Sequence, residues 1–286
     1  MRGADRIPDT LVPWKVPVAM NKPGFMEAGG GGSSWRPSAA SPEAIINPRR
    51  GKNEPPVSPR VILTFAQADY ELLGDLSGVG LPPRSLFNCP FSQGSWGGRA
   101  VTVVAPAMGA PYAVMVLENL IALGARMVLA FGWCGSLQAD VRIGALVLPK
   151  RAVPGDGTSR HYCPEGQTYL EPHPVLYAGL EARLKETPVP WQAGSIWTTD
   201  AVYRETAEFV RHCQERGILA VEMEMAALFA VGQFRQVPVA GLLVVSDELF
   251  TLKWRHGYRA PHFHRTRELA ARLVLDAAAA WKDGDV

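Results

Sequence analysis

From about residue 61 onward, short apolar runs alternate with longer stretches in which apolar and polar positions recur at helical spacing. The apolar runs predict strands at 61–65, 101–105, 128–131, 145–148, 194–198, 217–221 and 238–245. Helical spacing predicts helices at 111–123, 174–185, 205–216, from 225 onward, and at about 265–281. Strands and helices that alternate in this way form a helix-covered sheet. We therefore predict one α/β domain with a mixed, mainly parallel central sheet flanked by helices.

The first 57 residues follow a different pattern. They are interrupted by prolines and by the run GGGGSS at 29–34, and they show no sustained periodicity. Because such a composition is typical of flexible linkers, we predict a flexible N-terminal extension over 1–57 and a folded domain over 58–286. The connection at 154–174 is long for a loop between two elements, and we expect it to lie over the ligand site.

The stretch VEMEMAALF at 221–229 places two carboxylates in an otherwise apolar run. If the preceding strand continues, Glu222 and Glu224 project to the same face, opposite Val221 and Met223. A buried carboxylate is costly without polar partners, so one interpretation is a ligand site at this strand-to-helix junction. The other interpretation is structural, with the acids accepting hydrogen bonds from backbone donors at the helix N-terminus.

Three further predicted strands end in residues suited to a ligand site. Asp247 follows the apolar run at 238–245, the glycine-rich segment GWCGS at 132–136 follows the run at 128–131, and Met108 and Gly109 follow the run at 101–105. In open α/β sheets, ligands bind beyond the carboxyl ends of the strands. The four strand ends together predict one site.

These motifs resemble those of the nucleoside phosphorylase/nucleosidase superfamily, which includes purine nucleoside phosphorylases, uridine phosphorylases and methylthioadenosine nucleosidases. VEME at 221–224 and SD at 246–247 are similar to the family's most specific elements. MGAP at 108–111, GWCGS at 132–136 and TDAVY at 199–203 resemble further family segments in the same order. The resemblance covers the chain from about residue 60 and implies a phosphorylase-like fold with the catalytic domain at 58–286.

The resemblance implies that Glu224 binds the ribose hydroxyls, because a carboxylate accepts two O–H donors and stabilises a developing sugar cation. It implies that Met223 packs against the sugar and that Glu222 is a secondary hydroxyl partner. Met108 would offer an adaptable apolar surface below the ribose.

At the base, the resemblance implies that Asp247 is a general acid toward N7 of a purine, with a pKa raised by an apolar surround. Uridine-specific relatives lack an acid at this position, which favours a purine-type base. Val202, Tyr203 and Trp133 would contact the substrate. Ordinary packing at a helix start is the competing interpretation for Val202 and Tyr203.

The chain departs from the family where phosphate binds. Family phosphorylases hold phosphate with a glycine after the first strand, an arginine shortly beyond it, and an arginine and a serine at the glycine-rich loop. These positions hold Ala66, Tyr70, Ala130 and Trp133, so neither arginine is present. The hydrolytic nucleosidases' glutamate and arginine positions hold Gln67, Asp69 or Tyr70, and Leu243. A rebuilt anion site could use cations near the presumed site loops, namely Arg160, His161, Lys253 and Arg255, although each is also explained as a solvated surface cation.

We therefore expect cleavage of the N-glycosidic bond of a purine-type nucleoside by phosphorolysis, without a cofactor and with phosphate as co-substrate. Hydrolysis is one alternative, and a non-catalytic nucleoside-binding protein is another, because the phosphate ligands are missing. Family members complete their pockets across subunits, so we expect a homo-oligomer. Two histidines at 262 and 264 lack a third ligand, and we predict no metal site.

Composition adds little beyond solubility. Net charge is +2 and gives no argument for nucleic acid or an anionic membrane as a partner. No apolar run approaches the length of a membrane span, and the N-terminus has no hydrophobic signal core. The four cysteines, including Cys134 in the glycine-rich segment, have no paired spacing, so we expect free thiols and a cytoplasmic protein.

Overall fold

The computed structural model describes residues 44–79 and 83–282. The predicted N-terminal extension at 1–57 falls mainly outside the described residues, and its described part, 44–57, is without helix or strand. No helix in the described ranges is long and apolar enough to cross a membrane.

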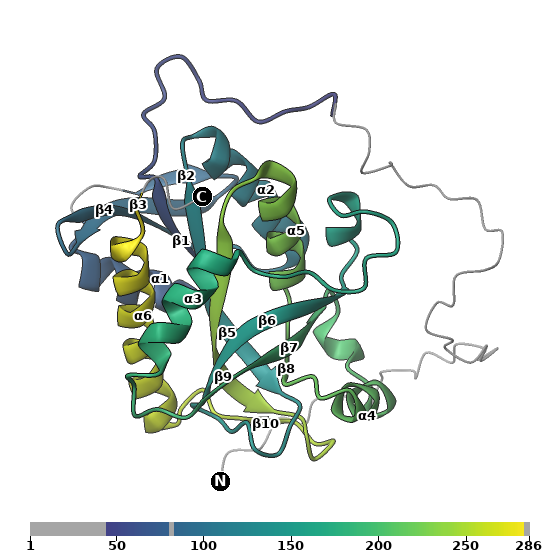
Figure 1. Ribbon diagram of the computed structural model, residues 1–286. Helices are drawn as coiled ribbons and strands as arrows, with labels where there is room; N and C mark the ends of the chain where they lie inside the picture. The colour runs from purple at the N-terminus through teal and green to yellow at the C-terminus, as the bar shows by residue number, and fades with distance from the viewer. Residues whose placement is uncertain (1–43, 80–82, 283–286) are drawn as a thin grey trace, which may run out of the picture. The chain divides into compact units, whose positions relative to one another are not determined.

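One sheet contains all the strands of the described chain, in the order β10-β9-β6-β7-β8-β5-β1-β4-β3-β2, and an additional pairing joins β9 to β5. The strands are β1 (Arg60–Thr64), β2 (Arg84–Leu86), β3 (Cys89–Trp96), β4 (Arg99–Val104), β5 (Met127–Ser136), β6 (Leu146–Gly155), β7 (Trp191–Thr199), β8 (Ala220–Glu222), β9 (Val239–Glu248) and β10 (Arg255–His256). Because β5 pairs with both β8 and β9, the strands β5, β9, β6, β7 and β8 form a closed circuit (Figure 1).

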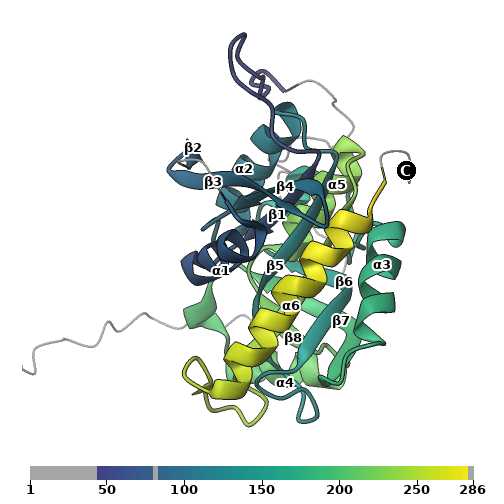
Figure 2. The same ribbon diagram turned by 90° about the vertical axis from the view of Figure 1, so that its left-hand side faces the viewer.

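Helices cover both faces of this sheet. They are α1 (Gln67–Ser77), α2 (Ala110–Ala122), α3 (Pro174–Leu184), α4 (Ala207–Glu215), α5 (Met225–Arg235) and α6 (Pro261–Ala280), with short 3-10 turns η1 (Ser159–His161) and η2 (Val202–Arg204). Figure 2 shows the long C-terminal helix α6 crossing one face of the sheet beside α3. The predicted α/β class and the mixed sheet are confirmed.

Side-chain alternation along the strands divides the core. Val61 and Leu63 of β1 pack into the cluster that contains α2 and α5, whereas Ile62 packs into the cluster that contains α3 and α6. This period of two is what a strand buried on both faces produces. It explains why the predicted strands are continuous apolar runs rather than alternating ones.

Several elements differ from their predicted bounds. The glycine-rich segment 132–136, expected as the continuation beyond a strand end, belongs to β5 and pairs with β9. Glycine is required there, because a Cβ on Gly132 would lie 2.5 Å from Cδ2 of Phe65. β6 runs on to Gly155, and α6 begins at Pro261, earlier than its apolar spacing indicates. α1, β2, β3 and β10 have no counterpart among the predicted elements.

Close packing of α5 against β9 depends on Gly232. A Cβ at this position would lie 2.6 Å from Cγ2 of Val239 and 3.0 Å from the carbonyl oxygen of Val237. The same substitution at Gly179 in α3 would meet nothing closer than Arg183, at 3.9 Å. The two helical glycines therefore form a matched pair.

We expect Gly232→Ala to lower the free energy of unfolding by about 1–3 kcal/mol, because overpacking forces a shift of helix against strand. Gly179→Ala should raise it by about 0.5–1 kcal/mol, since alanine restricts the unfolded chain and favours helix. Urea unfolding of both variants measures the difference. Equal stability of the two variants would contradict the packing argument.

Candidate active site

Glu222 is the buried acid at the junction of β8 and α5. Its Oε2 accepts hydrogen bonds from the backbone N–H groups of Glu224 (2.6 Å) and Met225 (2.7 Å), and its Oε1 accepts one from the hydroxyl of Thr198. These contacts agree with the structural interpretation of Glu222, in which the acid accepts hydrogen bonds from backbone donors at a helix N-terminus. Burial raises the pKa of Glu222 to about 7 despite these donors.

Glu224 is the first residue beyond the strand and stands at the N-terminal boundary of α5. Its Oε1 accepts a hydrogen bond of 2.5 Å from the backbone N–H of Gly109, the N-cap residue of α2, which joins the start of α2 to the start of α5. Gly109 has a φ of +89°, a conformation open to glycine. Burial, followed by the nearby charge of Glu222, raises the pKa of Glu224 to about 8. The strand alternation expected from the sequence thus ends at Glu222, yet the two carboxyls remain close enough to interact.

The two predicted methionines are sequence neighbours of the residues in this hydrogen bond, since Met223 precedes Glu224 and Met108 precedes Gly109. Met223 is half-buried at the turn into α5. Met108 is 63% exposed in the segment before α2, next to Gly109. The hydrogen bond between Gly109 and Glu224 therefore brings two of the four predicted strand ends together.

Asp247 lies near the end of β9. Its Oδ1 accepts a hydrogen bond of 2.6 Å from the hydroxyl of Ser246, and its Oδ2 accepts one of 3.0 Å from the indole N–H of Trp254. Burial raises the pKa of Asp247, and these two donors oppose the rise. The pairing of β5 with β9 shifts register at Cys134 and Gly135, so that Gly135 faces Asp247. A Cβ on Gly135 would lie 2.5 Å from Cδ1 of Leu249 and 3.0 Å from Oδ2 of Asp247, which explains the glycine.

The predicted base contacts Val202 and Tyr203 lie on η2. Val202 is 46% exposed and Tyr203 is 97% exposed, so within this chain neither forms part of a packed wall. Glu205, which follows them, has its pKa raised to about 7 by burial and by the charge of Asp247. This places the segment after η2 near the end of β9.

Aromatic residues not singled out by sequence reasoning lie beside Asp247. Trp254, His256 and Tyr258 contact one another, and Tyr258 also contacts Trp133, with ring centroids 5.9 Å apart. Their spacing of two in the sequence is the signal that could have identified them, since it places alternate residues of an extended segment on one side.

The positions where the family holds phosphate are occupied by packed groups. Ala130 is fully buried, and Trp133 packs edge-on against Phe263 at 5.2 Å. Asp69, also fully buried, lies 3.4 Å from Nε of Arg267, and burial raises its pKa to about 7. The Trp133 indole lies near the same carboxyl without a hydrogen bond of good geometry.

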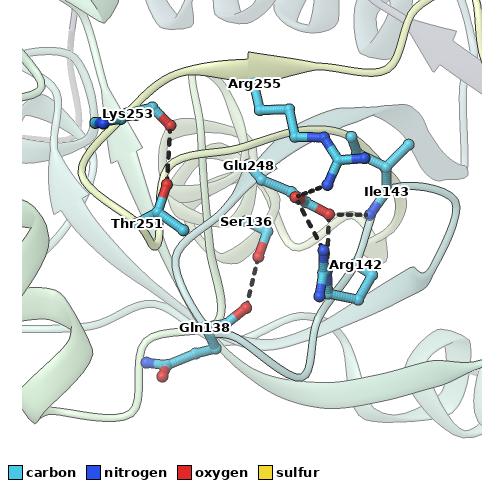
Figure 3. Close-up of polar contacts among 8 residues, drawn as sticks. All are labelled: Ser136, Gln138, Arg142, Ile143, Glu248, Thr251, Lys253 and Arg255. Carbon is cyan, nitrogen blue, oxygen red and sulfur yellow. Dashed lines mark hydrogen bonds and ion pairs between the residues drawn. The ribbon is translucent and has the colours of Figure 1, made fainter.

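Tyr70, which stands at the position of a family arginine, shares a hydrogen bond of 2.6 Å with Ser92. The cations suggested for a rebuilt anion site are either paired or exposed. Arg255 forms an ion pair of 3.2 Å with Glu248, which also pairs with Arg142 at 2.9 Å (Figure 3). Arg160 and His161 are exposed on η1, and Lys253 is exposed in the loop after β9.

The four cysteines are all buried and unpaired, as predicted. Burial raises the pKa of Cys134 well above its ordinary value, so its thiol is a poor nucleophile. In the described ranges, no three His, Cys, Asp or Glu side chains are grouped to hold a metal ion.

Comparison with known proteins identifies the fold and the family. The model of the Phosphorylase superfamily matches residues 59–279. Guanosine phosphorylase of Halorubrum lacusprofundi is 30% identical over 156 residues, which are 54% of this chain and 64% of the relative. A DeoD-type purine nucleoside phosphorylase of Jannaschia sp. is 31% identical over 166 residues, 55% of this chain and 68% of the relative.

Among solved structures, uridine phosphorylase from Vibrio fischeri superposes with a TM-score of 0.72 at 24% identity, over 79% of this chain and 93% of that chain. This likeness concerns the fold. The family match, in contrast, spans most of the chain and includes every strand end described above. The chain therefore belongs to the Phosphorylase superfamily.

Proposed function

We propose that this protein cleaves the N-glycosidic bond of a purine nucleoside by phosphorolysis, releasing the base and a pentose 1-phosphate. The observation that carries the proposal is a pair of carboxyls on separate elements, the buried Glu224 and the half-buried Asp247, whose pKa values are both raised by desolvation. Titratable groups perturbed in this way concentrate at functional sites. Family membership and the names of the relatives support the reaction class.

At the sugar, Glu224 would accept hydrogen bonds from the ribose hydroxyls. The carboxyl accepts a hydrogen bond from the N–H of Gly109, and bound hydroxyls would supply further polar partners to this buried group. They would also favour the charged form, which stabilises an oxocarbenium-like transition state. Met108 and Met223 would pack against the sugar, and Glu222 would hold α5 in position, with a direct contact to a hydroxyl as a secondary role.

At the base, Asp247 would act as general acid. Burial raises the pKa of Asp247, and so favours the protonated form that proton donation to a departing purine requires. After the transfer, Ser246 and Trp254 would stabilise the carboxylate, since both donate to it. Trp133, Val202 and Tyr203 would complete the substrate contacts.

Hydrolysis is the second candidate for the same site. It is favoured by the residues at the phosphate positions, where Ala130 is fully buried and Trp133 is packed against Phe263. Phosphate binding ordinarily draws on backbone amides, hydroxyls and cationic forks. A third candidate, a nucleoside-binding protein without turnover, has the same warrant.

We also propose that residues 58–286 form the catalytic domain, after an N-terminal extension over 1–57. The family match from residue 59 and the start of β1 at Arg60 support this boundary. The unpaired cysteines support a reducing, cytoplasmic location.

Substitution of the two carboxyls should separate their roles. Glu224→Gln removes the charge that binds the diol, so KM should rise and kcat should fall together. Asp247→Asn keeps a hydrogen-bond donor toward the base but cannot transfer a proton, so KM should be nearly unchanged while kcat falls by roughly a hundredfold or more. Steady-state kinetics on inosine measures both changes.

A nucleoside whose base departs readily without protonation is the control for this pair. It should restore turnover by Asp247→Asn and leave Glu224→Gln impaired. Equal losses on good and poor leaving groups would contradict the role of Asp247 as acid. Wild-type rates from both variants would make the carboxyls structural.

The nucleophile can be identified from the products. With neither arginine present, we expect base release that saturates only near millimolar phosphate, since each lost charged hydrogen bond weakens binding by about 1.5–3 kcal/mol. Product analysis should show pentose 1-phosphate. Free pentose formed at the same rate without phosphate would select hydrolysis, and bound but uncleaved nucleoside would select the non-catalytic alternative.

We predict at least a dimer in solution. Met108, Val202 and Tyr203 are exposed around the proposed site, and exposed apolar groups at a functional rim are typical of a subunit interface. Light scattering should give a mass of at least twice the 31.0 kDa of the chain. An active monomer would contradict this prediction.

A further inference from the structure

The segment after β9 returns toward the site and presents three rings on one side. We call Trp254, His256 and Tyr258 the aromatic arm. His256 stacks on Tyr258 with centroids 5.6 Å apart and an interplanar angle of 12°, and Trp254 lies 5.2 Å from His256. Tyr258 continues the row to Trp133 of β5. The rings are thus preorganised against one another rather than dispersed in solvent.

The aromatic arm is fastened to the sheet. Arg255 and His256 form β10, which pairs antiparallel with Glu248 and Asp247 of β9. The backbone N–H of Gly257 donates to the carbonyl of Ser246 at 2.7 Å. Glu248, on the strand face opposite to that of Asp247, receives both Arg142 and Arg255, as Figure 3 shows. Glu248 is buried, and these donors lower its pKa. The carboxylate is therefore charged at neutral pH, and its ion pairs hold the aromatic arm against β9.

Trp254 is held by a hydrogen bond of its indole N–H, while most of its surface is open to solvent. Its indole N–H donates to Oδ2 of Asp247, yet the residue is 63% exposed. An indole that is held by its edge and open on its surface is a stacking platform, since aromatic rings gain most from offset contact with another flat ring. His256 is likewise exposed, and Tyr258 is 39% exposed.

We propose that the aromatic arm is the base-recognition surface of this protein, with Trp254 stacking on a bicyclic purine and holding Asp247 in position toward it. The proposal rests on the proposed function and names the element that selects the base. Trp254 is a binding residue through its ring and a positioning residue through its N–H.

The expected base contacts from the sequence motif do not provide such a surface. Val202 has no ring, and Tyr203 is almost fully exposed on η2. In contrast, the aromatic arm lies in direct hydrogen-bond contact with the proposed acid. A bicyclic base covers more of an indole than a pyrimidine does, so discrimination follows from contact area.

The surroundings of Asp247 define how its protonation responds to the arm. Besides the two donors, five titratable groups interact electrostatically with Asp247. They are His256 and Tyr258 of the arm, Glu248 of its own strand, Glu205 after η2 and the Cys134 thiol of β5. Donation from Trp254 lowers the pKa of Asp247. Loss of that N–H therefore raises the pKa, and the protonated acid persists to higher pH.

Two substitutions of Trp254 separate ring from N–H. Trp254→Leu should weaken binding of free hypoxanthine, measured by calorimetry, by roughly tenfold to a hundredfold, which is the value of one base–aromatic stack. Trp254→Phe keeps a ring, so the Kd for hypoxanthine should change less than about threefold, and the alkaline limb of the kcat profile on inosine should move upward. The ratio of purine to pyrimidine nucleoside cleavage should fall only in Trp254→Leu.

Trp96 provides the matched control. Its indole N–H also donates to an aspartate, Asp276 of α6, at 2.7 Å, far from the ends of β5 and β9. Trp96→Phe and Trp96→Leu should leave base affinity and the pH profile unchanged, whatever they do to stability. Circular dichroism of all four variants checks that they are folded.

Wild-type affinity for hypoxanthine in a folded Trp254→Leu variant would overturn the stacking role. An unmoved alkaline limb in Trp254→Phe would overturn the positioning role. Both results leave the proposed function intact, provided that the wild-type protein cleaves inosine. A wild-type protein that neither binds hypoxanthine nor cleaves any nucleoside would overturn the proposed function together with this inference.

Discussion

One buried carboxylate joins the closed part of the sheet to the helix that carries the proposed sugar ligand. Glu222 ends β8, accepts two N–H groups at the start of α5, and contacts Thr198 of β7. The same hydroxyl of Thr198 accepts the N–H of Ala226 at 3.0 Å. These contacts satisfy helix donors that would otherwise be unpaired in the core. Since Glu224 follows two residues later, its position beside Gly109 depends on this junction.

Burial of several acids in one region has an electrostatic consequence. The pKa values of Glu222 and Glu224 are both raised, chiefly by burial. An acid with a raised pKa in the folded state binds more protons than it does unfolded, so folding stability falls as the pH rises from the unfolded pKa toward the folded one. Ionisation of these acids near neutral pH therefore lowers folding stability. A ligand that donates hydroxyl groups to Glu224 would offset this loss.

The base side and the anion side of the site are built differently. Around Asp247, donors and rings come from β9 and the segment behind it, and the fastening by Glu248 keeps them in register. Toward α1, Asp69 is paired with Arg267, and the Trp133 indole lies near the same carboxyl. Family membership alone does not distinguish these two sides, because both lie at the carboxyl ends of strands. The departures from the family motifs are concentrated on the anion side.

Much of the fold followed from local pattern. Continuous apolar runs predicted the central strands and helical spacing predicted most helices, because burial on both faces of a sheet leaves a signal within a few residues. The VEME and SD motifs likewise identified Glu224 and Asp247, because an acid within an apolar run is visible in the local sequence and is costly to bury without polar partners.

The contacts of those acids depended on residues distant in the chain. Thr198 meets Glu222 only because β7 and β8 pair, and Trp254 meets Asp247 only because β10 folds back on β9. The ion pair of Asp69 with Arg267 requires α1 and α6 to lie on the same face. Periodicity specifies which side of an element is buried. It does not specify which partner covers that side, because the partner is set by the order in which the strands close the sheet.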